Sequence, residues 1–132
     1  MPNYNGNGSV QRASAGFMAD GQTAKQYVGK QATSTSATTT VTFETVTTGK
    51  TFYITDIYLG SDVLSSTQIL DLQIQAAGAT IHRAPVHNLS PDEFPGIETQ
   101  PFATSGQLVT LLIPITAGGI VNVYYNIYGF EQ

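Results

Sequence analysis

The 132-residue sequence contains no cysteine, and only 11% of its residues are charged, less than half of the usual quarter. The absence of cysteine excludes a disulfide scaffold, a zinc site built on thiolates and a cysteine nucleophile. The shortage of charged residues excludes a coiled coil, and the net charge of -4 is too small for a wholly disordered chain. No apolar run approaches the roughly 20 residues of a membrane span, and the first residues do not have the regions of a signal peptide. A polar domain with no membrane partner is therefore expected.

The few charges are unevenly distributed. Residues 1–50 hold four cationic side chains and two carboxylates, whereas residues 51–132 hold one cationic side chain and seven carboxylates. Nucleic-acid binding normally requires a clustered basic patch, so no nucleic-acid partner is expected. This uneven distribution is either due to chance, or it allows the weakly basic residues 1–50 of one copy to lie on the acidic residues 51–132 of another copy.

Residues 1–37 differ in composition from the rest of the chain, being rich in Asn, Gly, Ala, Ser and Thr. Such a segment buries too little apolar surface to offset its own ordering entropy. It is either a flexible tail or an extended arm that becomes ordered against a partner. Scattered aromatic residues favour the arm, and its candidate partner-binding anchors are Tyr4, Phe17 and Tyr27.

From residue 38 onward, apolar and polar residues alternate with a period of two, and no helix-start signal is present. Four prolines between residues 85 and 101 restrict that passage to short strands. The pattern predicts an all-β domain over residues 38–132, an antiparallel β-sandwich that is jelly-roll-like, with an extended N-terminal arm before it. The expected strands cover residues 40–46, 51–59, 68–75, 79–84, 107–115 and 120–130.

The expected strand at residues 51–59 changes phase. Phe52 and Ile54 share one face, whereas Ile57 and Leu59 share the other. A bulge near Thr55 would bring all four side chains into the core.

The last expected strand has two different faces. One face carries Val121, Val123, Tyr125 and Ile127, and the pattern predicts that they lie in the core. The opposite face is an amphipathic row of Asn and aromatic residues whose candidate partner-binding members are Tyr124, Tyr128 and Phe130. Such a row is typical of a protein interface, of an ordinary solvated sheet or of a carbohydrate-stacking platform.

No catalytic arrangement is evident. His82 and His87, with Asp92 and Glu93, are candidate ligands for a divalent metal, but they lack the His-x-His spacing of metal-binding jelly rolls. No Gly-x-Ser-x-Gly motif and no phosphate-binding loop is present. We therefore expect no enzyme activity, no metal and no cofactor.

Three segments carry a resemblance to a known group of proteins: Gly49-Lys50-Thr51-Phe52-Tyr53-Ile54-Thr55-Asp56, Pro101-Phe102 before Ser105-Gly106-Gln107-Leu108, and residues 121–131. With them, residues 49–132 resemble small β-sandwich proteins of tailed-phage structural modules, such as capsid decoration and head-fibre proteins. The resemblance implies a virion protein on the capsid surface. It also implies the major capsid protein as partner and a homo-oligomer, with a trimer favoured.

A second function stays open from the sequence. A carbohydrate-binding β-sandwich of a phage fibre or tail would use the exposed tyrosines as stacking platforms for sugar rings.

Overall fold

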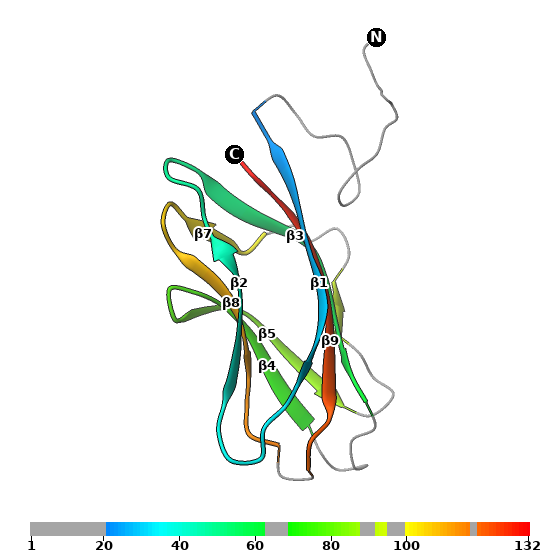
Figure 1. Ribbon diagram of the computed structural model, residues 1–132. Coiled ribbons are helices and arrows are strands. Elements are labelled where there is room, and N and C mark those ends of the chain that lie inside the picture. Colours follow the sequence, from blue (N-terminus) through cyan, green and yellow to red (C-terminus); the bar gives the residue numbers. More distant parts are fainter. Residues whose placement is uncertain (1–20, 63–68, 88–91, 95–99, 117–118) are drawn as a thin grey trace.

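The computed structural model describes residues 21–62, 69–87, 92–94, 100–116 and 119–132 (Figure 1). The described residues form strands, turns and loops, and none of them lies in a helix that would cross a membrane. The strands are β1 (Thr23–Ala32), β2 (Thr39–Thr45), β3 (Thr51–Ser61), β4 (Ile69–Ala76), β5 (Ala79–His87), β6 (Asp92–Phe94), β7 (Phe102–Thr104), β8 (Leu108–Ile113) and β9 (Asn122–Glu131).

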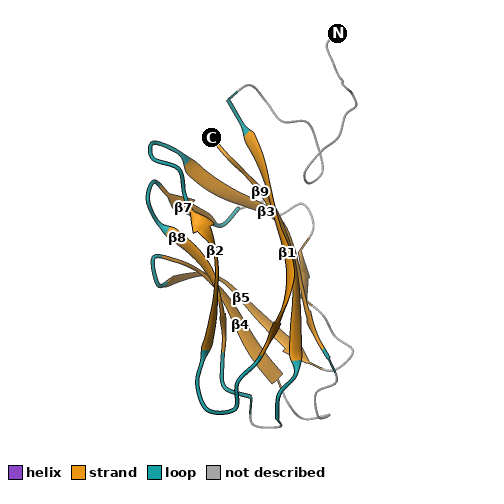
Figure 2. Cartoon of the chain, viewed as in Figure 1, coloured by secondary structure: helices purple, strands orange, loops and turns teal. Residues whose placement is uncertain are grey.

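The strands form two antiparallel sheets that pack face to face (Figure 2). One sheet has the order β1-β9-β3-β6, with β7 also paired to β3, and the other has the order β2-β8-β4-β5. The strands pair in a nested order, in which each pair encloses the previous one in the sequence: β4 with β5, β3 with β6 and β7, β2 with β8, and β1 with β9. Further pairing of β3 with β9 and of β4 with β8 rolls these pairs into two sheets. This is the jelly-roll topology, and it confirms the predicted fold class.

The arrangement of β1 corrects the predicted start of the sandwich at residue 38. β1 pairs with β9 over its whole length, from Thr23 opposite Glu131 to Ala32 opposite Asn122. Residues 23–32 therefore belong to the sandwich and not to an arm. The small number of apolar residues in this segment led to the wrong assignment. An edge strand is held by backbone hydrogen bonds to its neighbour and needs few apolar side chains of its own. Residues 1–20 of the predicted arm, with Tyr4 and Phe17 among them, lie outside the described residues.

The bulge predicted in β3 is confirmed. The register between β3 and β9 shifts between Ile54 and Asp56, so the phase of alternation changes there. As a result, the side chains on either side of the shift all enter the core, and each is at most 1% exposed: Phe52, Ile54, Ile57 and Leu59.

The core lies between the two sheets and consists mainly of aliphatic side chains. β4 and β8 supply Leu72, Ile74 and Leu111, and β9 supplies Val123 and Ile127, all fully buried. Each of these residues alternates with a more exposed neighbour, as the period of two requires. β9 therefore directs one row of side chains into the core and the other row to the outside.

Candidate functional site

The outer side of the β1-β9-β3-β6 sheet carries a group of aromatic side chains. They alternate along their strands with buried residues and are half-buried or exposed. We call this surface the aromatic face, and it consists of Tyr53, Tyr58, Phe102, Tyr124, Tyr128 and Phe130.

One end of the aromatic face is a row of three rings on adjacent strands. In the sheet, Tyr53 of β3 lies opposite Phe130 of β9 and opposite Phe102 of β7. The centroid of the Tyr53 ring is 5.3 Å from that of Phe130 in a stacked arrangement, and 6.0 Å from that of Phe102. Phe102 remains 52% exposed at the margin of the row. These rings thus form a continuous apolar strip that extends to solvent.

The middle of the face combines rings with amide groups. Tyr128 lies between Gln26 of β1 and Asp56 of β3 in the register of the sheet. Asn126 donates from Nδ2 to the Tyr128 hydroxyl at 3.4 Å and accepts at Oδ1 from Nε2 of Gln26 at 3.2 Å. Hydrogen-bonding groups are thereby placed beside the apolar strip, as in the polar parts of protein interfaces.

The other end of the face is organised by Asp62. Its Oδ2 accepts from Nδ2 of Asn122 at 2.6 Å, and it also accepts from the hydroxyl of Tyr124. The side chain of Asn122, followed by that of Tyr124, lowers the pKa of Asp62. The same contact with Asp62 raises the pKa of Tyr124. The hydroxyl of Tyr124 is thus held by Asp62, while the residue as a whole remains 45% exposed.

The outer side of the second sheet has a different character. Arg83 of β5 pairs with Asp71 of β4, and Thr80 donates from Oγ1 to Oε1 of Gln73 at 2.6 Å. Threonines also dominate the outward positions of β2. Ile69 of β4 and Leu108 of β8 are exposed aliphatic residues on this side, but its described residues include no outward Phe or Tyr, so we call it the polar side. The difference between the two sides identifies the aromatic face as the better candidate for binding.

The predicted site residues fall into two groups. Tyr124, Tyr128 and Phe130 share the outer side of β9, as the alternation predicted. Tyr27 is different, because its ring stacks on Phe43 with centroids 5.0 Å apart and meets Phe52 edge-on at 5.8 Å. It therefore packs within the sandwich and is not an anchor on an arm.

The sequence interpretation missed Tyr53, Tyr58 and Phe102. The two tyrosines each precede or follow a buried residue, Phe52 or Ile57, so the alternation in β3 already places them outside. Only the strand order, which puts β3 and β7 beside β9, shows that they extend the row on the last strand.

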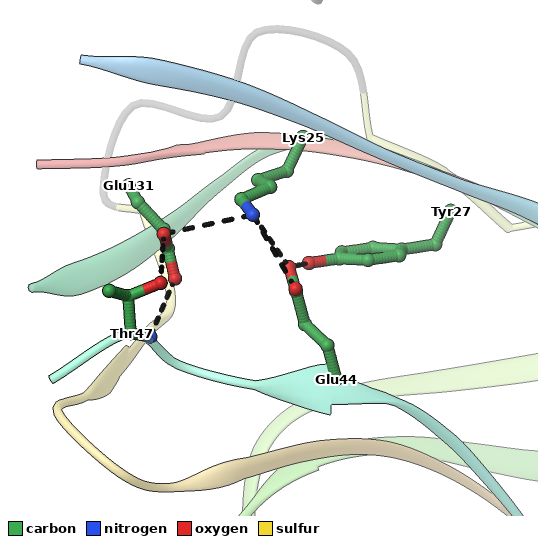
Figure 3. Close-up of polar contacts among 5 residues, drawn as sticks. All are labelled: Lys25, Tyr27, Glu44, Thr47 and Glu131. Carbon is green, nitrogen blue, oxygen red and sulfur yellow. Dashed lines mark hydrogen bonds and ion pairs between the residues drawn. The ribbon is translucent and has the colours of Figure 1, made fainter.

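A polar cluster joins the two sheets at the end of the sandwich where β9 finishes (Figure 3). Lys25 of β1 lies 3.3 Å from Oε1 of Glu44 on β2 and 3.7 Å from Oε1 of Glu131 on β9, measured from Nζ. The hydroxyl of Tyr27 donates to Oε1 of Glu44, and Thr47 donates to Glu131 from its backbone N–H and from Oγ1. One ammonium group therefore bridges two carboxylates from opposite sheets.

The pKa values in this cluster follow from these contacts. Burial raises the pKa of the Tyr27 hydroxyl, and its hydrogen bond to Glu44 raises it further, so the phenol stays protonated. Burial alone would raise the pKa of Glu131, but the donors of Thr47 and the charge of Lys25 outweigh it and lower the pKa. Glu131 is therefore an ion held by hydrogen bonds and is not a proton donor at neutral pH. These features indicate a structural clamp between the sheets.

The candidate metal ligands of the sequence lie on two strands, His82 and His87 on β5 and Asp92 and Glu93 on β6. Within the described part of the chain, no three His, Cys, Asp or Glu side chains gather in a way that would hold a metal ion.

Comparison with protein-family models gives no match for the chain, and comparison with curated protein sequences gives none either. The resemblance to phage structural proteins therefore stays a prediction.

Proposed function

We propose that the protein is a virion structural protein without enzyme activity, a capsid decoration protein that binds the assembled head through its aromatic face. The observation that carries the proposal is the contrast between the two outer sides of the sandwich. One side presents six aromatic residues on adjacent strands, whereas the described residues of the other present no Phe or Tyr but threonine, glutamine, an exposed ion pair and the separate aliphatic side chains of Ile69 and Leu108. Aromatic residues are enriched at protein interfaces because they bury a large area at a low entropy cost.

The proposed partner is the major capsid protein in its assembled form. A protein that binds only the assembled shell stabilises that shell by mass action. Symmetry repeats the contact over the capsid surface, so a small interface on each copy has a large combined effect. The all-β sandwich and its inter-sheet clamp supply a rigid body on which the aromatic face is preformed, which reduces the entropy cost of binding.

The test is co-sedimentation with intact capsids of the phage whose genome encodes the chain. We expect the wild-type protein to sediment with capsids, and Tyr124→Ala and Phe102→Ala to weaken binding by about 10-fold or more, the loss of one well-packed interface residue. The matched controls are Gln73→Ala and Thr42→Ala on the polar side, which should bind as the wild type does. Equal binding by all four variants, or no sedimentation of the wild type, would contradict the proposal.

Carbohydrate binding is the second candidate, favoured by the exposed rings of Phe102 and Tyr124, which are 52% and 45% exposed. Exposed aromatic rings also suit stacking against the apolar face of a sugar. Binding of the isolated protein to a glycan array, lost in Tyr124→Ala and retained in Gln73→Ala, would favour this function over capsid decoration.

A further inference from the structure

The edge strands of the sandwich differ in how they are protected. An edge strand has unpaired backbone N–H and C=O groups that can bind a strand of another chain. Proteins prevent such pairing with short edge strands, proline, charged side chains or a bulge. β6 has three residues, β2 has a register shift between Thr42 and Glu44, and β5 contains Pro85. β1 has ten residues in unbroken register with β9 and contains no proline. It carries two charges, Lys25, whose ammonium is held inside the sandwich by Glu44 and Glu131, and Lys30 on the outer side of the sheet. Within the described residues, no strand pairs with the outer edge of β1.

The backbone groups available on β1 follow from one hydrogen bond. The N–H of Thr33 donates to the carbonyl of Val121 at 2.9 Å, in continuation of the β1–β9 ladder. Hydrogen-bonded positions alternate along an antiparallel pair. The odd-numbered residues of β1 therefore bond to β9, and the even-numbered residues 24–32 direct their N–H and C=O groups away from it. The same even-numbered residues have their side chains on the outer side of the sheet, where Val28 is 62% exposed.

We propose that the edge of β1 binds the edge of β1 in a second copy of this chain, antiparallel, about a two-fold axis at Val28. In this register Val28 lies opposite Val28 of the second copy, and Gln26 lies opposite Lys30. Ala24 lies opposite Ala32 at the two ends. Every one of these residues directs its backbone groups to the edge, so the two strands form a regular ladder.

The side chains favour this occupant and this register. The exposed Val28 side chains cover each other at the axis, and the amide oxygen of Gln26 faces the ammonium of Lys30. Like charges are not placed opposite each other, which would weaken cross-strand pairing. A register centred on Tyr27 would instead place Val28 against Gln26 and leave both valines without an apolar neighbour.

The two-fold axis is perpendicular to the sheet, so the pairing joins two sheets into one and keeps both aromatic faces on the same side. Such an interface is isologous and closes after two copies. It therefore gives a dimer, where the resemblance to phage proteins implied a trimer. The inference does not rest on the proposed function, because it is drawn from the backbone edge of β1, whereas the proposed function is drawn from the outward rings of β3, β7 and β9.

The first experiment measures mass in solution by light scattering or sedimentation equilibrium over a range of concentrations. We expect the wild type to have twice the mass of one chain, and Val28→Lys and Val28→Pro to have the mass of one chain. Proline at position 28 removes an edge donor but no bond to β9, so the fold is retained. The matched control is Thr42→Lys, at an outward position on the edge strand β2, which should remain a dimer. Circular dichroism confirms that each variant is folded, and Val28→Lys tests the edge if the proline variant is not.

The second experiment measures amide hydrogen exchange along β1. In a dimer, both the odd-numbered and the even-numbered amides of residues 24–32 are protected, whereas Val28→Lys should lose protection at the even-numbered amides alone. Because the chain has no cysteine, a spin label on Val28→Cys gives one label per copy, and two labels close together are expected at the axis. A wild-type monomer, a trimer, or a dimer that survives Val28→Lys would overturn the proposal. Protected even-numbered amides in a monomer would assign the edge to residues 1–20 of the same chain and would also overturn it.

Discussion

The buried carboxylate of Glu131 accepts two hydrogen bonds from Thr47, at 2.9 Å from the backbone N–H and at 2.8 Å from Oγ1, although 84 positions separate the two residues. Thr47 follows β2 in one sheet, whereas Glu131 ends β9 in the other (Figure 3). The pair therefore connects the two sheets at the end of the sandwich where β9 finishes. Its position makes the stability of the fold depend on a charged group.

Thr47→Val should lower the free energy of unfolding by about 1–3 kcal/mol, because it removes one hydrogen bond to a buried charged group. The measurement is urea denaturation followed by fluorescence or circular dichroism. Thr48→Val is the control, since Thr48 is exposed and adjacent. A loss of the same size in both variants would show that the hydroxyl of Thr47 contributes nothing specific.

Acid should weaken the fold through Glu131. The pKa of its carboxyl is lower in the folded state than its ordinary value, so the unfolded state binds the proton more readily. The stabilisation is therefore present above the unfolded pKa of about 4.3 and is lost as the pH falls through the folded pKa. We expect Glu131→Gln to be less stable than the wild type at pH 7 and to lose less stability on acidification. Parallel pH profiles for the two proteins would contradict this assignment.

Lys25→Met should destabilise the protein by roughly 1–3 kcal/mol at neutral pH, because the bridging cation is lost and two carboxylates remain near each other. The deficit relative to the wild type should shrink as the pH falls through the lowered pKa of Glu131, because the negative charge that Lys25 stabilises is then lost. Unfolding free energies of both proteins across this range provide the measurement. A Lys30→Met control, on the exposed side of β1, should show a smaller pH-dependent difference, because its charge is only the last of the contributions that lower the pKa of Asp62.

Gly129→Ala should destabilise the sandwich by about 1–3 kcal/mol through overpacking. A Cβ at this position would overlap the backbone oxygen of Tyr53 and would lie 2.6 Å from Cε1 of Phe52 in the core. Gly29→Ala is the comparison, because its Cβ would lie 2.7 Å from Cζ of Tyr125, at the far end of a side chain and not against backbone atoms. Thermal unfolding of both variants should show the larger loss for Gly129→Ala, and the reverse order would contradict the argument.

Most strands of the fold were predictable because their signal is local. The alternation in β4 and β9 and the change of phase in β3 each lie within about ten residues. β1 was not recognised because its inward positions include Lys25 and Gln31, which do not form an apolar row. The strand exists because β9, at the far end of the chain, pairs with it.

The candidate site was predictable only in part, for the same reason. The outward row of Tyr124, Tyr128 and Phe130 follows from alternation within one strand. The contribution of Tyr53 and Phe102 depends on which strands are neighbours, and no local pattern gives that information. The cluster of Lys25, Glu44 and Glu131 likewise requires three strands from two sheets.

The pairing of β1 with β9 also sets the order in which the protein can fold. Gln22 donates from Nε2 to Oε1 of Gln132 at 2.8 Å across 110 positions of sequence, so this ladder closes the longest loop of the described chain. Closing a long loop costs conformational entropy before the contacts that it allows can stabilise the folded state. Folds rich in contacts between distant residues therefore form slowly, in about milliseconds to seconds. The β4–β5 hairpin can form early on a growing chain, whereas β1 waits until β9 has been synthesised. During synthesis, therefore, the contact of Lys25 with Glu131 cannot form until the last residues of β9 have been added to the chain.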